Sequence, residues 1–431
     1  MFETLKNAWK IVDLRKKILF TLFILVIYRL GCAIPGPFID PSVLQNMMGE
    51  DTMFGFLNAV SGGAFEDATV LALGVIPYIN AQIIIQLLTI AIPALERLAK
   101  EGEDGRKKLN AITRYSTIGL AILQGFGYYL VLKNQKGALL YSTGASGVLT
   151  AVALVAIFTA GAMLAMWLGD QITEKGIGNG VSFLIFANIV ARLPTEISKF
   201  IKYLQFAQQG QTQYFFYVPL MIVVMVATIV MIIFMNNSER RISVQYAKRV
   251  VGRKMYGGQS THIPIKVNMS GVLPIIFASS FLALPATIRM FVAPAPGSFW
   301  DQFFNAFSSR SLVYGIFYFI LIIAFNYFYV AVQYNPIEMA NNLRKNNGGI
   351  PGIRPGKPTS DFIGRVVSRI TFIGALFLGV VATLPIAIGG ITNMSVSLTG
   401  TSLIIVVGVA LETVKQLESQ MMMRHYKGFL E

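Results

Sequence analysis

The chain has 431 residues, of which 54% are hydrophobic and only 13% are charged. Soluble globular domains usually carry about 25% charged residues, so this composition excludes an ordinary soluble protein and indicates a membrane protein. The formal net charge of +15 would favour nucleic acid as the partner of a soluble domain, but here the basic residues fall between apolar stretches, which favours anionic lipids or a large anionic partner such as ribosomal RNA.

The first residues predict a helix at the membrane surface. Residues 2–17 are basic and amphipathic, with Phe2, Leu5, Trp9 and Val12 at helical spacing. A basic amphipathic segment of this kind lies in the interface rather than across the bilayer. We therefore expect an interfacial helix that leads into the first span.

Ten apolar stretches follow, and most are about 20 residues long, the length that crosses a hydrocarbon core of about 30 Å. Alternate loops are placed on alternate sides, and Arg114, Arg192, Arg289, Arg365 and Arg369, near the ends of their stretches, are counted with the adjacent loops. This puts 28 of the 36 Lys and Arg on the side of the termini and 7 on the other, with Arg29 inside the first stretch. Cytoplasmic loops carry the Lys/Arg excess, so both termini are predicted to be cytoplasmic. The predicted spans are residues 18–33, 69–92, 112–132, 148–168, 181–193, 214–235, 272–293, 312–332, 363–388 and 396–411.

A Gln-rich polar segment, residues 194–213, separates the fifth span from the sixth. We expect it to be an external hinge loop between an N-terminal half, residues 1–193, and a C-terminal half, residues 214–431. Five spans per half is an odd number, so the two halves enter the membrane in opposite orientations. This is the condition for inverted repeats with a functional path at their interface. The longest cytoplasmic loops are residues 236–271 and 333–362.

Two glycine-rich segments interrupt the pattern of spans. Residues 54–68 are too short to cross the membrane, yet Phe54, Leu57 and Phe65 would be costly in water. They are compatible with an interfacial loop or with a re-entrant segment buried in protein. The motif GIGNG at 176–180 lacks the Lys-Ser/Thr ending of a phosphate loop and is expected to permit a tight turn into the fifth span.

The spans are nearly free of ionisable residues. Arg29, Asp170 and Arg289 lie near span ends, where we expect them to reach water. Transporters place ionisable residues at membrane depth to bind ions or relay protons, so a secondary solute transporter with inverted repeats is the less favoured alternative. Two histidines and one cysteine make a metal site improbable. No catalytic motif is found, and we expect neither an enzyme nor a cofactor.

Four longer segments resemble the SecY family, the channel subunit of the bacterial Sec protein translocase. The resemblance runs through the whole chain in order. It implies an all-α polytopic membrane protein with ten transmembrane helices in two inverted five-helix halves around a central pore. The matching segments are residues 62–88 (GGAFEDATVLALGVIPYINAQIIIQLL), 174–182 (EKGIGNGVS), 245–271 and 351–356 (PGIRPG).

The resemblance also implies roles for individual residues along the path. Residues 54–68, with Phe54, Leu57 and Phe65, would form a plug that seals the outer funnel. Spans two and three would face spans seven and eight as a lateral gate for apolar segments, with the polar residues Asn80, Gln86, Gln124 and Ser279 near it. An aliphatic ring would close the pore, formed by Val75, Ile79, Ile185, Ile276 and Ile405.

The implied function is the movement of unfolded polypeptides across a bacterial cytoplasmic membrane and the lateral release of transmembrane segments. Arg253, Lys254 and Arg354 match positions that engage the ribosome or the SecA motor ATPase. Further implied partners are SecE-like and SecG-like small membrane subunits, polypeptides that carry signal sequences, and anionic lipids. Arg354 lies between Pro351 and Pro355, where a constrained backbone can present its side chain.

Overall fold

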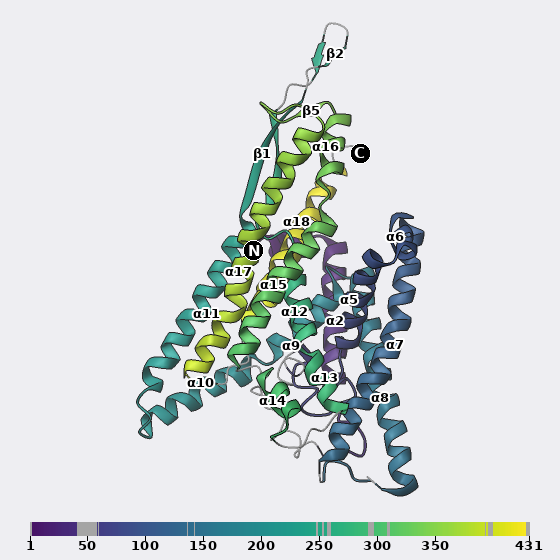
Figure 1. The fold of residues 1–431 in the computed structure, drawn as a ribbon, viewed down its shortest axis with the longest axis vertical. Coiled ribbons are helices and arrows are strands. Elements are labelled where there is room, and N and C mark those ends of the chain that lie inside the picture. The colour runs from purple at the N-terminus through teal and green to yellow at the C-terminus, as the bar shows by residue number, and fades with distance from the viewer. Residues whose placement is uncertain are drawn as a thin grey trace.

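The computed structural model shows two groups of helices that meet along the length of the molecule, with a small β-structure at one end (Figure 1). The description below covers residues 2–40, 58, 60–135, 137–141, 143–246, 249–251, 254–256, 260–291, 297–307, 311–392, 394 and 400–427.

The N-terminal half and the segment expected as a hinge contain the helices up to residue 208. A short surface helix, α1, ends at Lys10, and α2 begins at Val12, so the basic helix expected over residues 2–17 is broken at Ile11. The helices are α1 (Phe2–Lys10), α2 (Val12–Cys32), α5 (Ile76–Ala91), α6 (Pro93–Lys100), α7 (Glu103–Asn134), α8 (Gly144–Lys175), α9 (Gly180–Ala191) and α10 (Leu193–Gln208).

The C-terminal half forms the taller part of the molecule in Figure 1. Its longest helix, α17, packs on α15, α18 and α11, and α18 also packs on α11. The helices are α11 (Tyr214–Asn237), α12 (Leu273–Leu282), α13 (Leu284–Phe291), α14 (Phe299–Ala306), α15 (Leu312–Gln333), α16 (Pro336–Lys345), α17 (Lys357–Thr392) and α18 (Gly400–Lys427).

The predicted polytopic helical architecture is confirmed, while the number of ten spans is not established. Within the described residues, seven helices are long and apolar enough to cross a membrane, or eight if the pair α5 and α6, bent by 102°, is one span. The seven correspond to the predicted spans three to six and eight to ten. The seventh predicted span is divided between α12 and α13, and the second contains irregular backbone before α5 begins at Ile76.

The segment expected as an external hinge loop is mostly helical. Residues 193–208 form α10, which continues from α9 and leads to the foot of α11 (Figure 1). Pro194 occupies the first turn, where its missing N–H costs nothing, and no glycine follows until Gly210. The expectation of a loop was wrong because glutamine, although polar, is a good helix former.

The loops expected to be cytoplasmic contain β-structure that was not predicted from the sequence. Strand β1 (Glu239–Tyr246) pairs antiparallel with β4 (Ser260–Lys266) and with β5 (Gly348–Gly349), and β2 (Arg249–Val251) pairs with β3 (Lys254–Tyr256). Ile242 and Val244 of β1 are buried while their neighbours are exposed, the alternation typical of a strand with one covered face. They pack with Leu343 of α16 and Ile363 of α17.

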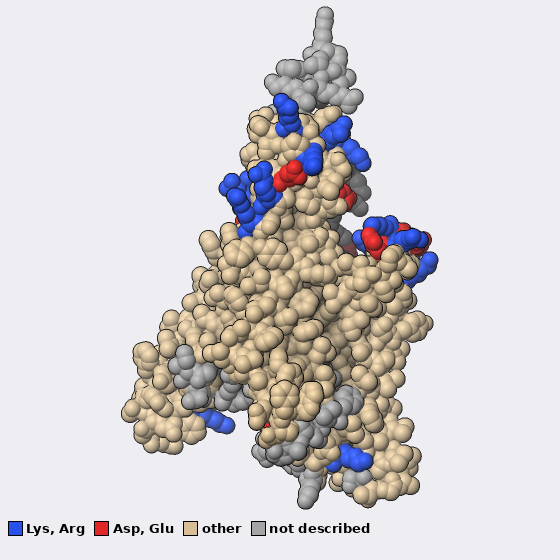
Figure 2. Space-filling view, viewed as in Figure 1, with Lys and Arg blue, Asp and Glu red and all other residues tan. Residues whose placement is uncertain are grey.

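Charged side chains gather at one end of the molecule. Lys and Arg cluster over the lobe formed by β1, β5 and α16, and Lys, Arg, Asp and Glu mix at the tip of α6 and α7, while few lie at the opposite end (Figure 2). The expanse between the two ends is almost uncharged in this view. The charge asymmetry expected from the loops is therefore also an asymmetry in space.

Glycine permits a close helix contact where α8 crosses the irregular backbone before α5. A Cβ at Gly161 would lie 2.0 Å from the carbonyl oxygen of Val70, whereas a Cβ at Gly119 of α7 would meet nothing within 4 Å. Because the obstructing atom at Gly161 is backbone, the helix itself would have to move.

Gly161→Ala is therefore expected to lower the free energy of unfolding by about 1–3 kcal/mol, the usual cost of overpacking. Gly119→Ala is the matched control and should be neutral or slightly stabilising, because alanine is the better helix former. Thermal unfolding of both variants in the same detergent measures the difference. Equal melting temperatures would show that α8 does not approach Val70 this closely.

Candidate functional site

The five residues of the predicted aliphatic ring lie in one cluster of buried apolar side chains. Val75 caps the N-terminus of α5 and Ile79 lies one turn into it, Ile185 lies on α9, Ile276 on α12 and Ile405 on α18. All five are at most 9% exposed. The cluster thus joins helices of both halves, which is what a constriction at their interface requires.

The C-terminal half contributes four buried residues to this cluster, namely Ile276, Phe277, Ile405 and Val409. Two of them were predicted as ring residues. Val409 and Ile189, one helical turn beyond Ile405 and Ile185, were not. Residues four apart in a helix lie on the same face. This spacing could have indicated Val409 and Ile189 from the sequence, once Ile405 and Ile185 were assigned to the ring.

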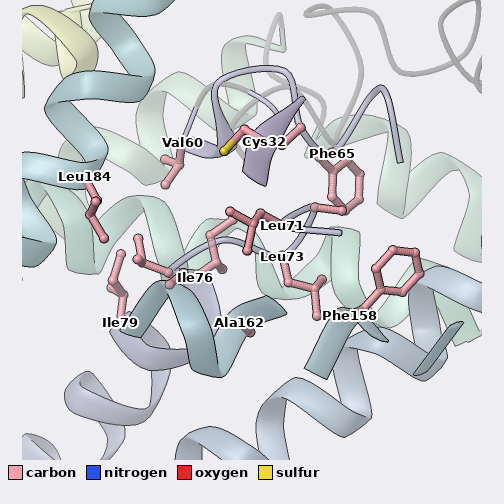
Figure 3. Close-up of a cluster of buried hydrophobic side chains, with 14 of the residues drawn as sticks. Cys32, Val60, Phe65, Leu71, Leu73, Ile76, Ile79, Phe158, Ala162 and Leu184 are labelled. Atoms are coloured by element: carbon pink, nitrogen blue, oxygen red, sulfur yellow. The ribbon is translucent and has the colours of Figure 1, made fainter. Parts of the chain in front are cut away.

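Irregular backbone is buried inside the same cluster. Residues 62–75 form turns rather than a regular helix, and Ala64, Phe65 and Leu71 are at most 2% exposed. The ring of Phe65 stacks on Tyr128 of α7 with 4.5 Å between centroids, and the Tyr128 hydroxyl donates a hydrogen bond to the Phe65 carbonyl. Figure 3 draws part of the cluster, with Ile79 and Leu184 on one side and Phe65 and Phe158 on the other.

This segment is also tied to the end of α2 by backbone hydrogen bonds. Gly36 N–H donates to the Ala68 carbonyl at 2.9 Å, and Val70 N–H donates to the Ile34 carbonyl at 3.0 Å. Non-helical backbone at membrane depth is stable only when protein satisfies it, and these contacts do so. Of the predicted plug residues, Phe65 is thus deeply buried, while Phe54 and Leu57 lie outside the described residues.

The predicted gate residues divide into two groups. Asn80 and Gln86 of α5 and Gln124 of α7 are partly exposed, on helices that pack against each other and against α12 and α13. Ser279 differs, because it is 2% exposed and its hydroxyl lies 3.0 Å from that of Tyr318, which lies 2.7 Å from that of Thr401. Its polar contacts are therefore within the C-terminal half and give no support to a place in the gate.

The turn that carries Arg354 has the geometry expected for a presented side chain. Gly352 and Gly356 adopt positive φ angles of 81° and 104°, which glycine tolerates at little cost. Thr359 donates from its hydroxyl to the Arg354 carbonyl at 2.9 Å, while the Arg354 side chain is exposed. Arg253 lies outside the described residues, and Lys254 begins the short strand β3.

The motif at 176–180 forms the expected turn into a helix. Asn179 caps α9 by accepting a hydrogen bond from the Ser182 N–H at 3.1 Å, and a Cβ at Gly180 would lie 1.9 Å from the Gly169 carbonyl oxygen. Arg29, which was expected to reach water near a span end, is partly exposed, and its guanidinium also donates to Asn188 of α9 at 3.2 Å.

An apolar bundle of this kind, with two helical halves that meet at aliphatic side chains and an irregular buried segment packed among them, has the architecture of a membrane channel. The sequence pattern of the SecY family matches residues 69–414. The protein translocase subunit SecY of Streptomyces coelicolor is 44% identical, and that of Mycobacterium tuberculosis is 43% identical, in both cases over the full length of both chains.

Solved structures share the fold at lower identity. A protein-conducting channel has a TM-score of 0.62 at 19% identity and covers 94% of this chain and 91% of its own. Sec61 in a canine ribosome-channel complex has a TM-score of 0.59 at 18% identity with the same coverage. The chain belongs to the SecY family. It is a multi-pass membrane protein and a protein-conducting channel, of a family that comprises translocation channels rather than enzymes.

Proposed function

We propose that the channel is closed at rest by the ring of Val75, Ile79, Ile185, Ile276 and Ile405. The observation that carries this proposal is that helices from both halves bring these side chains into one buried cluster. A narrow aliphatic constriction excludes water and ions by dewetting, and it has no charge to trap a passing polypeptide. Aliphatic side chains also rearrange around varied substrate side chains without leaving a polar group unpaired.

Residues 54–68 form the outer plug in this proposal, and α5 and α7 part from α12, α13 and α15 as the lateral gate. The burial of Phe65 supports the first assignment. The second is supported by the packing of α5 on α12 and of α7 on α13. Gln86 and Gln124 make the contact between the two sides of this gate less apolar and therefore weaker. An apolar substrate segment can then displace that contact and pass into the lipid.

Partners engage the basic lobe on the cytoplasmic side of a bacterial inner membrane, where both termini also lie. A groove of about 580 Å³ opens beside the Arg354 turn, lined by Gln245, Tyr246, Arg344 and the residues from Asn347 to Pro351. The exposed Arg354 beside this groove suits an acidic partner. The SecA motor, the ribosome, SecE-like and SecG-like subunits, signal-sequence-bearing polypeptides and anionic lipids complete the proposed system, with Arg253 and Lys254 as further contacts.

Photo-crosslinking tests the proposed path. A photoreactive residue at Ile79 should crosslink to a secretory polypeptide arrested in the channel, and one at Gln124 to an arrested apolar helix. Val223 of α11, which is 63% exposed, is the control. It should give neither product, because α11 is not one of the helices of the proposed gate. Crosslinks of equal strength at Val223 and Gln124 would contradict a gate between α7 and α13.

A further inference from the structure

One face of α9 carries an apolar ring residue followed by two polar residues. Ile185, Asn188 and Arg192 are spaced by three and four residues, which places them on the same side of a helix. Ile185 lies in the aliphatic cluster. Asn188 lies about one turn further along α9, and Arg192 is the residue that caps its C-terminal end.

Asn188 is completely buried and uses both ends of its amide. Its nitrogen donates to the Tyr28 hydroxyl at 2.9 Å and to the Val60 carbonyl at 2.7 Å, and its oxygen accepts from Arg29 at 3.2 Å. Two donors and an acceptor satisfied in this way fix the orientation of the amide. The contact with Val60 joins α9 directly to the backbone of the re-entrant segment.

Arg192 makes the second link, through an acidic residue of the same segment. Its guanidinium lies 3.6 Å from the Glu66 carboxylate, in a pair whose side chains are 14% and 24% exposed. The buried Asn58 holds Glu66 at two points, donating to its carboxylate at 2.7 Å and accepting from its N–H at 3.2 Å. A partly desolvated ion pair supported by further hydrogen bonds is costly to break on one side only.

The backbone of the segment also approaches α9 closely. Gly62 has a φ angle of 68°, and a Cβ there would lie 2.9 Å from the Cβ of Asn188 and 2.7 Å from the Arg29 guanidinium. Any larger residue would push the segment away from the helix. The segment is therefore shaped to lie against Asn188.

We propose that Asn188 and Arg192 of α9 form a latch that positions the re-entrant segment and couples its release to the opening of the ring. Because Ile185 is on the same face of the same helix, a movement of α9 that widens the constriction also withdraws Asn188 from Val60 and Arg192 from Glu66. The two seals then open as one event. This inference rests on the proposed role of the segment as the outer seal.

The test is a charge exchange across the ion pair. Arg192→Glu and Glu66→Arg should each raise the resting ion conductance of the full chain, purified with the subunits that stay bound, in planar lipid bilayers. A shift of about 1.4 kcal/mol toward the released state corresponds to about a tenfold rise. The double exchange should restore the low conductance, which a merely structural loss would not allow. Lys202→Glu is the control, an equal charge change on an exposed residue of α10, and should stay silent.

Two further variants make every outcome decisive. Glu66→Gln keeps the size of the side chain, should fold, and should leak to an intermediate extent, so it replaces either reversal that is not recovered as folded protein. The resting ion conductance of a variant that lacks residues 54–68 shows whether this segment seals the channel. The latch is rejected if the deletion variant conducts ions while the point variants remain silent, or if the double exchange fails to restore the low conductance. In either case the sealing role of residues 54–68 is retained. If the deletion variant is silent, the sealing role fails and the latch with it.

Discussion

Ile405→Asp is expected to turn a silent resting channel into one that conducts ions. Ile405 is 3% exposed and lies in the cluster that joins the two halves. A carboxylate there cannot remain ionised without water, since burying an unpaired charge costs far more than a side chain gains by packing. Water drawn to the carboxylate would wet the constriction and abolish the dewetted barrier. Single-channel recording in planar bilayers measures the resulting open probability.

Two companions separate loss of the seal from loss of the fold. Ile405→Leu keeps an aliphatic side chain of the same volume and should remain silent. Ile79→Asp, on α5 of the other half, should leak like Ile405→Asp, because both side chains lie in the same cluster. The ring assignment would be rejected if both Asp variants were recovered folded from detergent and still conducted no more than the parent chain.

The sequence predicted those features of the fold that depend on hydrophobic periodicity and charge. Seven of the ten expected spans correspond to long apolar helices, and the turn at 176–180 and the presentation of Arg354 followed from Gly and Pro chemistry. The ring residues came from the resemblance to the SecY family, because an isoleucine in a span is by itself compatible with core packing or with lipid contact.

What the sequence did not reveal depends on contacts between distant residues. Nothing local distinguishes Ser279 as a partner of Tyr318, 39 residues away. Asn188 finds its partners at Tyr28 and Val60, 160 and 128 residues away. The helix α10 and the hairpin of β1 and β4 had local signals, namely the Pro194 start and the alternation at Ile242 and Val244. These signals were outweighed by the polar composition of both segments.

Arg354→Glu is expected to cripple motor-driven translocation while the channel still inserts and folds. The turn between Pro351 and Gly356 holds the backbone in a defined conformation, and the Arg354 side chain is exposed beside a groove. A planar guanidinium offers five donors to an acidic partner, and a Glu in its place repels that partner. Loss of one interface hot spot costs about 2 kcal/mol or more, so the rate of precursor transport into vesicles should fall at least about thirtyfold.

The pattern across three variants distinguishes recognition by the guanidinium from general charge. Arg354→Lys should be intermediate, because it keeps the charge but loses the planar fork of donors. Lys345→Glu makes an equal charge change at an exposed residue in the last turn of α16. It should have a much smaller effect, since no constrained turn presents Lys345 to a partner. Rates that fell equally in Arg354→Glu and Lys345→Glu would mean that the lobe acts only through its net charge, and a normal rate in Arg354→Glu would remove Arg354 from the partner interface altogether.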